Sequence, residues 1–291
     1  MLSLVSSDVP DFELSSVPIP RHLARFIDSW LGYREVSAQA VERMEHPSGR
    51  AVLIFEFGDP IELRESCGAS ARFRTGFFAG IGDTPTLTRF SGEQAGIEVN
   101  LSPEGTFALA QGALGEFKGR AVETVDLRID ASLGPKLREA KSWEARFQIV
   151  ENALWARFAS ARALSPLVRR AIDLIDTRHG SLRIESLSEA LRASRGYVHE
   201  RFVVETGFSP KRYAALRRFS RVKSMLRNGD AESLARVALA AGYADHAHLS
   251  REVRKFAGTT PAGLTRDLKK PIALEVSQLL SADGASFPGR E

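Results

Sequence analysis

The feature that most constrains this chain is a motif that occurs twice, fifty-one positions apart, in its last third. The first copy is SRGYVHERFVVETGFSP (residues 194–210) and the second is DHAHLSREVRKFAGTTP (residues 245–261). Each copy opens on a residue that can cap a helix, Ser194 or Asp245, and closes on glycine followed by Ser-Pro or Thr-Pro. Glycine favours a left-handed helix end, and proline suits the first turn of a further helix. The motif therefore predicts two helices with matching starts and stops.

Apolar side chains give each predicted helix one buried face. In the first copy Val198 and Phe202 stand four residues apart and so share a helix face. Leu249 and Val253 do the same in the second copy. A short apolar stretch precedes each helix; its residues are Ile184, Leu187 and Leu191 in the first copy and Leu234, Val237, Ala238 and Ala241 in the second. A short helix, a turn and a second helix form the helix-turn-helix signature, whose second helix enters the major groove of DNA.

The run GYADHAHLSREVRKFAGTTP, preceded in the chain by SRGYVHERFVVETGFSP, resembles the AraC/XylS class of bacterial transcription regulators. The resemblance covers about the last third of the chain and implies a DNA-binding domain of two helix-turn-helix units joined by a linker helix. Residues 210–228 have the helical spacing that the linker needs. A helix of that length spans roughly 27 Å, close to the ~34 Å between successive turns of one major-groove face. Both second helices are therefore expected to read the same side of the duplex.

Basic charge is concentrated in the same region. Residues 164–270 hold 21 Lys and Arg against 11 Asp and Glu, whereas the rest of the chain holds 19 against 25. Localised positive charge suits phosphate binding, because affinity for the DNA backbone comes mainly from counterion release. A merely soluble basic surface is the alternative, and the doubled motif favours DNA.

Residues opposite the buried stripes are the candidates for DNA contact, because successive helical residues are about 100° apart. The candidate DNA-binding residues are Arg195, Gly196, His199, Glu200, His246, Ala247, Ser250, Arg251, Arg254 and Lys255. Arg251 is the strongest candidate for a base contact, since a guanidinium can donate twice to guanine O6 and N7. Lys255 is expected to contact phosphate instead.

The first copy departs from the family pattern. Family members often have arginine where this chain has Glu200, and the arginine here is displaced to Arg201, near the buried side. Glu200 can accept a hydrogen bond from cytosine N4 but repels phosphate, so base contact and a solvated surface position both stay open. Gly196 offers no side chain to a base. After the second copy the family usually has an aromatic residue and then arginine; this chain has GLTR at residues 263–266, so the last helix is expected to pack more loosely.

The part of the chain before the doubled motif has the sequence pattern of a β domain. Short apolar runs between residues 48 and 99, such as AVLIFEFGDP and RFRTGFFAGIG, are separated by Gly, Asp, Pro and Ser. They predict an antiparallel sandwich or barrel, to which Tyr33–Met44 adds a strand. The resemblance implies a cupin-like sensor or dimerisation domain there. The expected fold class is α+β, with an N-terminal β-rich, cupin-like domain, a helical segment and a C-terminal all-α double helix-turn-helix domain.

Helical spacing of apolar residues also marks Leu133–Phe158, between the two parts. A helical hairpin packed on the β domain is the favoured interpretation, and a dimerisation surface is the alternative. The predicted divisions are a sensor or dimerisation domain at 1–128, a helical connector at 129–163, the DNA-binding domain at 164–270 and a frayed tail at 271–291.

A metal-dependent cupin enzyme fused to a DNA-binding module is the main alternative function. Before residue 164 the only histidines are His22 and His46, with no His-x-His pair and no carboxylates at ligand spacing. Cys67 is the single cysteine, so neither a disulfide nor a zinc cluster is expected. We therefore expect no catalytic residues, no metal and no cofactor. A nucleoid-type architectural protein is a further alternative, disfavoured by the large upstream domain.

The expected partner is double-stranded DNA, in the cytoplasm. The sequence has no window of about twenty apolar residues and no secretory leader pattern, so no membrane partner is expected. The upstream domain is expected to bind a small-molecule effector or to form a homodimer, and the sequence does not decide between them. RNA polymerase is a further expected partner if the regulator is an activator.

Overall fold

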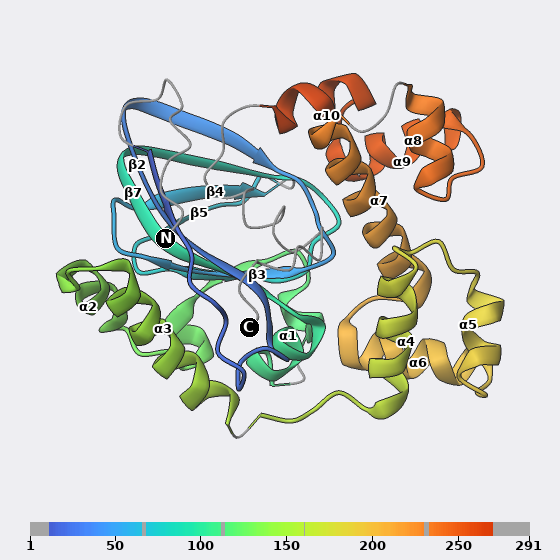
Figure 1. Cartoon of the computed structure of the whole chain (residues 1–291), viewed down its shortest axis with the longest axis horizontal. Coiled ribbons are helices and arrows are strands. Elements are labelled where there is room, and N and C mark those ends of the chain that lie inside the picture. The colour runs from blue at the N-terminus through green and yellow to red at the C-terminus, as the bar shows by residue number, and fades with distance from the viewer. Residues whose placement is uncertain (1–11, 66–67, 112–113, 160, 230–232, 270–291) are drawn as a thin grey trace, which may run out of the picture.

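The computed structural model describes residues 12–65, 68–111, 114–159, 161–229 and 233–269 (Figure 1). Its strands are β1 (Phe12–Ser15), β2 (Ile27–Glu45), β3 (Ala51–Glu56), β4 (Ile61–Glu65), β5 (Ser70–Phe73), β6 (Phe77–Ala79), β7 (Thr86–Leu101) and β8 (Ala121–Glu123). The same half holds helix α1 (Pro103–Leu109) and the 3₁₀ turns η1 (Leu114–Phe117) and η2 (Thr124–Leu127). We call residues 12–127 the β domain. The strand expected at Tyr33–Met44 is confirmed, as part of β2.

The described strands form one antiparallel sheet, in the order β1-β2-β7-β3-β6-β8. The long strands β2 and β7 pair along most of their length, with two irregularities in register. The far end of β7, residues 96–101, pairs with β3. Its near end, residues 86–89, pairs with β4, which in turn pairs with β5. The sheet therefore divides at β7 into two branches.

An apolar cluster inside the sheet shows that the two branches face each other. Ile54 and Phe77 come from the branch of β3 and β6. Ile61, Leu63 and Phe73 come from the branch of β4 and β5. The rings of Phe73 and Phe77 lie 4.9 Å apart. The sheet therefore curls around its own core, as the sequence predicted for a sandwich or barrel.

The outer face of the sheet is covered by α2 (Leu133–Glu139) and α3 (Trp143–Phe158). Trp30 of β2 lies against Phe147 of α3, with ring centroids 5.0 Å apart. Gly32 allows the indole of Trp143 to approach the strand, because a Cβ there would overlap that ring. The connector is thus a helical hairpin packed on the β domain, which confirms the favoured interpretation.

The C-terminal part is helical. Its helices are α4 (Pro166–Thr177), α5 (Ile184–Ala190), α6 (Arg195–Thr206), α7 (Pro210–Asn228), α8 (Leu234–Ala240), α9 (His246–Ala257) and α10 (Pro261–Leu268). We call residues 166–268 the helical domain. The pairs α5–α6 and α8–α9 are the two helix-turn-helix units, and the 19-residue α7 is the linker between them. The predicted α+β class and the predicted bounds of the linker are confirmed.

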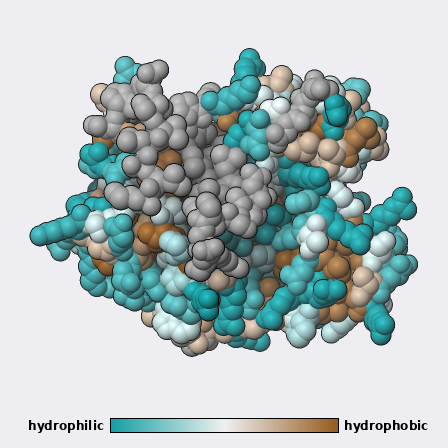
Figure 2. Space-filling view, viewed as in Figure 1, coloured by the Kyte–Doolittle hydropathy of each residue, from teal (hydrophilic) through white to brown (hydrophobic). Residues whose placement is uncertain are grey.

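Two details of the helical domain differ from expectation. The last helix, α10, is not loosely packed, because Leu264 and Leu268 are buried. A Cβ at Gly263 would overlap the hydroxyl of Thr259, in the turn just before α10, so glycine suits this position. Leu234, which belongs to the predicted apolar stretch, is exposed, as is Leu239 of the same helix, whose exposure is 69%. Figure 2 shows the corresponding hydrophobic patch over α8, at the upper right.

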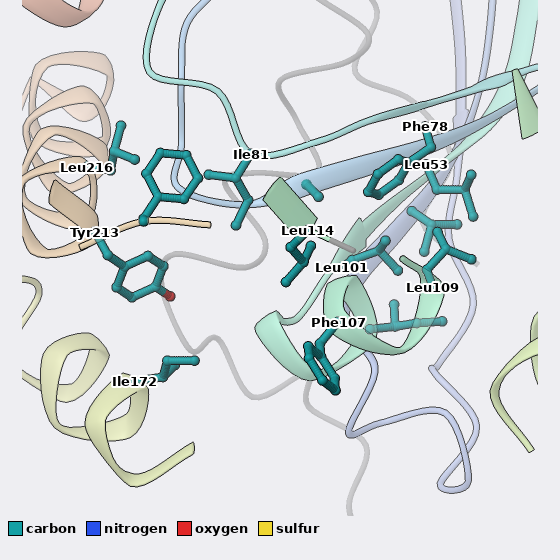
Figure 3. Close-up of a cluster of buried hydrophobic side chains, with 14 of the residues drawn as sticks. Leu53, Phe78, Ile81, Leu101, Phe107, Leu109, Leu114, Ile172, Tyr213 and Leu216 are labelled. Carbon is teal, nitrogen blue, oxygen red and sulfur yellow. The ribbon is translucent and has the colours of Figure 1, made fainter. Parts of the chain in front are cut away.

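The hydrophobic core continues from the β domain into the helical domain. Figure 3 shows Ile81 and Leu114 of the β domain in one cluster with Ile172 of α4 and with Tyr213 and Leu216 of α7. Because a buried core resists rearrangement, this cluster holds the linker helix against the β domain. The position of the linker is thus set by tertiary packing as well as by its own sequence.

Candidate nucleic-acid interface

The two recognition helices, α6 and α9, begin and end as the repeat predicted. Oγ of Ser194 accepts a backbone N–H from the first turn of α6. Oδ1 of Asp245 accepts the N–H of His248 at 2.7 Å, and this hydrogen bond lowers the pKa of the Asp245 carboxyl. Gly207 and Gly258 end the helices with φ of 75° and 67°, the left-handed region that favours glycine. Both units are therefore built from the same local signals.

Each recognition helix buries one stripe and exposes the opposite face. Val198 and Phe202 of α6 are buried, as are Leu249 and Val253 of α9. Of the predicted contact residues, the structure exposes Arg195, Gly196, His199, Glu200, His246, Ala247, Arg251, Arg254 and Lys255, and Ser250 is half-buried. The docked β domain therefore leaves both predicted DNA-binding faces open.

The face of α9 is strongly basic. Arg251, Arg254 and Lys255 are exposed, and within the described ranges no carboxylate forms an ion pair with them. The donors of Arg251 are used by no hydrogen bond to another described residue. An arginine in this state keeps its full donor set for the edge of a base. Arg254 and Lys255 lie in the last turn of the helix, one turn further from its N-terminus.

The exposed face of α6 is less basic than that of α9, because Arg201 pairs with a carboxylate of the helical domain. Nη2 of Arg201 donates to Oε1 of the buried Glu205 at 2.6 Å. Oε2 of Glu205 accepts the backbone N–H of Ser165, at the start of α4. Arg201 therefore stabilises the helical domain, in keeping with its predicted place near the buried side. Val204, by contrast, is 59% exposed, so α6 presents apolar as well as polar side chains.

Residues 187–267 match a family model described as a helix-turn-helix domain. The match runs from α5 into α10 and so includes both recognition helices and the linker between them. The helical domain of this chain therefore contains a helix-turn-helix domain of that family.

Comparison with solved structures finds likenesses at low identity. ToxT from Vibrio cholerae shares 13% identity with a TM-score of 0.47, over 83% of this chain and 98% of ToxT. The C-terminal domain of AraT, a response regulator from Geobacillus stearothermophilus, shares 27% with a TM-score of 0.34, over 35% of this chain and 86% of its own. An AraC-type transcriptional regulator from Chromobacterium violaceum shares 21% with a TM-score of 0.34, over 36% and 95%. Comparison with curated proteins finds no match.

Ion pairs tie the helical domain to the β domain. Arg50, between β2 and β3, donates to Asp28 and to Asp176 of α4, each at 2.6 Å. It also donates to the hydroxyl of Tyr213 on α7. Arg217 of α7 donates to Asp176 at 2.9 Å. Burial alone would raise the pKa of Asp176, but the two guanidinium groups lower it below its ordinary value. The carboxylate is therefore charged and links both domains.

Two further contacts extend this interface along α7. Nζ of the buried Lys223 donates to the carbonyl of His46 at 3.0 Å. Arg212 pairs with Asp83 at 2.8 Å. Burial, and then the nearby Lys223, lowers the pKa of His46 to about 4, so its imidazole is neutral at pH 7. The sequence analysis missed these contacts, because the partners stand 177 and 129 positions apart and no local pattern marks them.

The interior of the β domain holds a buried polar cluster beside its apolar core. The hydroxyl of Tyr33 donates to Oε1 of Glu56 at 2.6 Å, and both side chains are buried. Burial raises the pKa of Glu56 to about 8, although the Tyr33 hydroxyl and the Gln94 amide act against it. Nη2 of Arg43 donates to both oxygens of Glu35, at 2.6 and 2.7 Å. Oε2 of Glu56 and Nη1 of Arg43 reach hydrogen-bond geometry with no described residue.

Within the described ranges, no group of three or more His, Cys, Asp and Glu side chains is placed to hold a metal ion. None of the helices there is long and apolar enough to span a membrane. His22 lies beside Glu151 of α3, at 3.3 Å. Cys67 and the predicted tail at 271–291 lie outside the described residues.

Proposed function

We propose that this regulator places α6 and α9 in adjacent major-groove segments of its operator while the docked β domain controls how the two helices are presented. One observation carries the proposal: both predicted DNA-binding faces are exposed in the full chain, and the linker between them is held along the β domain. A helix of the linker's length spans roughly 27 Å, so it keeps the recognition helices at a nearly constant separation. The divisions expected from the sequence fit this arrangement and stay a proposal.

Arg251 provides the sharpest test of base reading. Fragments of the source genome that the purified protein retains would supply the specific site, and random duplex of equal length is the comparison. We expect Arg251→Ala to weaken the specific site by about 1 to 3 kcal/mol, roughly 5- to 150-fold, and random duplex by less. Lys255→Ala is the control, because removal of a phosphate contact weakens both duplexes alike and flattens the salt dependence.

Two outcomes of that experiment would contradict the proposal. Equal losses on both duplexes for Arg251→Ala would place Arg251 on phosphate. Failure of the wild-type protein to enrich any sequence would remove specific binding altogether and favour an architectural protein. The other predicted contact residues, His199, Glu200 and Ser250 among them, are open to the same comparison.

We infer that an effector of the β domain enters the polar interior of the curled sheet. Buried carboxyl groups predominate there, with Glu35, Glu56 and Glu98 beside the guanidinium of Arg43. Such a set favours a small molecule that offers hydroxyl or ammonium donors. A panel of polyols and primary amines tests this by thermal shift, with Tyr33→Phe as the matched variant. Stabilisation by carboxylic acids alone would contradict the inferred chemistry.

Homodimerisation, contact with RNA polymerase and a cytoplasmic location stay proposals as well. The exposed side of α3 is the candidate dimer surface, where Trp155 is partly exposed and packs edge-on against His22, with ring centroids 4.8 Å apart. Sedimentation of the wild type and of Trp155→Ser measures the oligomeric state. We infer that the chain is not an enzyme; stoichiometric iron, zinc or manganese in the purified protein would revive the alternative of a metal-dependent cupin enzyme.

A further inference from the structure

A groove of about 630 Å³ opens on the first helix-turn-helix unit, between α5, the start of α6 and the start of α7. Gly196 and His199, which belong to the predicted DNA-binding face of α6, form part of its wall. The groove therefore opens on the side of the domain that faces DNA in the proposed function. Its volume lies in the range of sites that hold whole ligands, so it is larger than a single ion requires.

The rim of this groove is basic. Arg183, Arg195, Lys211 and Arg218 line it, against the single carboxylate of Glu185. Glu185 pairs with Arg195 at 3.2 Å, and both side chains are more than half exposed, so water weakens that pair. Among the residues that the structure describes, no carboxylate pairs with Arg183 or Lys211. Arg218 pairs with Glu252 at 3.5 Å, so the unbalanced positive charge of the groove comes from Arg183 and Lys211.

The two units place their positive charge differently. Positions fifty-one apart correspond, so Glu200, Val203 and Val204 of α6 stand where α9 has the basic side chains. Those basic side chains are Arg251, Arg254 and Lys255. At the groove rim it is the first unit that has the basic residue, since Lys211 corresponds to Ala262 of the second unit. The first unit thus has its cations around the groove, and the second has them on the recognition helix itself.

Gly196 keeps one wall of the groove open. It lies in the first turn of α6, where a Cβ would meet no atom within 4 Å. No packing constraint therefore requires glycine, although glycine weakens a helix by up to about 1 kcal/mol relative to alanine. A missing side chain lets a ligand approach the backbone closely.

We propose that this groove clamps the sugar-phosphate backbone of one DNA strand, so that the first unit anchors the duplex and the second unit reads its bases. The proposal rests on the proposed function, because it takes DNA as the partner. A groove rim where cations outnumber carboxylates suits a phosphodiester chain. The apolar and acidic side chains on the face of α6 contribute little to phosphate binding, which leaves that role to the rim.

Charge-neutralising variants of the rim test the clamp. We expect Lys211→Gln and Arg195→Gln each to weaken the selected site and random duplex by the same factor, about three- to tenfold at moderate salt. The slope of log affinity against log salt should fall by about 0.9 for each phosphate that the variant no longer neutralises. Lys141→Gln, an exposed lysine between α2 and α3, is the matched control and should change neither quantity.

A pair of variants at Gly196 separates charge from bulk. Gly196→Glu and Gly196→Gln add side chains of nearly equal size, but only the first repels phosphate. We expect Gly196→Glu to lose at least ten times more affinity than Gly196→Gln, on both duplexes, with thermal stability equal in the two. Equal affinities for the pair would contradict the clamp.

The remaining outcomes are also decisive. An unchanged salt slope for Lys211→Gln and Arg195→Gln, with wild-type selection intact, would overturn the clamp and leave the proposed function standing. Losses on the selected site alone would make these residues base readers and overturn the division between the units. If inorganic phosphate bound in the groove at millimolar concentration and the variants kept the DNA affinity of the wild type, the groove would be assigned to a small anion instead.

Discussion

The carboxylate of Asp176 is the point where we expect one substitution to weaken the contact between the β domain and the helical domain. It accepts hydrogen bonds from Arg50 and Arg217 and from the hydroxyl of Tyr213. Asp176→Asn keeps the shape but leaves two guanidinium groups facing a neutral amide. Removal of one partner from a fully buried ion pair destabilises a protein by about 3 to 5 kcal/mol.

The expected magnitude for Asp176→Asn is smaller than that range. The side chain is 21% exposed, so water partly replaces the lost interaction. Arg50 also keeps Asp28 at 2.6 Å. We therefore expect a loss of about 2 to 3 kcal/mol in the free energy of unfolding at pH 7. Because the pKa of Asp176 is lowered in the folded state, this difference is fully present above about pH 4 and is lost as the pH falls through the lowered value.

Urea unfolding followed by two probes measures this effect. The three tryptophans, Trp30, Trp143 and Trp155, lie in the β domain and connector, so their fluorescence reports that side. Circular dichroism at 222 nm reports mainly the helices. We expect the two transitions to separate in Asp176→Asn more than in the wild type, because the domains no longer stabilise each other.

A matched control uses another carboxylate with an ion pair. Asp130 pairs with Lys136 at 3.0 Å but is 56% exposed, so water screens that pair and Asp130→Asn should cost much less than Asp176→Asn. A loss in Asp176→Asn no greater than in Asp130→Asn would refute the reasoning. It would mean that the apolar core alone joins the two domains.

Three further substitutions test the fold. Burial raises the pKa of Glu56 to about 8, so the folded state holds a proton that the unfolded state releases, and the stability of the protein falls between about pH 4.5 and 8. Glu56→Gln should abolish this loss and stabilise the protein by several kcal/mol at pH 8; a pH profile of the variant that is parallel to that of the wild type would contradict this. Ser209→Ala removes the acceptor for the N–H of Arg212 at the start of α7, and thermal denaturation should show a loss of about 1 kcal/mol; no loss would mean that the cap is dispensable. Leu249→Ala leaves a cavity under α9 and should destabilise the protein by about 2 to 5 kcal/mol, with DNA binding lost at lower temperature than in the wild type; a loss below 1 kcal/mol would argue against its burial.

Local signals explain why the helical domain was predictable. A cap such as Asp245 and a glycine such as Gly258 determine the ends of a helix from within a few residues. The linker followed for the same reason, since Ser209-Pro210 marks its start and Gly229 its end. The predicted contact residues could be placed because a buried stripe fixes the opposite face of the same helix.

Long-range contacts explain what the sequence could not supply. Arg50 and Asp176 stand 126 positions apart, and neither belongs to a motif. The groove on the first unit escaped prediction because Arg183 precedes α5, whereas Gly196 lies in α6 and Lys211 in α7. The burial of Leu264 and Leu268 in α10 is visible only once the helices are placed. Alternation of apolar residues predicted the strands but not the division of the sheet at β7.

Footprinting of the intact regulator on its selected site tests the placement of the two recognition helices most directly. Hydroxyl-radical cleavage maps the protected sugars, and methylation interference maps guanine N7 in the major groove. We expect two contacted major-groove segments on one face of the duplex, with centres about one helical turn, ~10 base pairs, apart. A single contacted segment, or two segments on opposite faces of the duplex, would contradict the account.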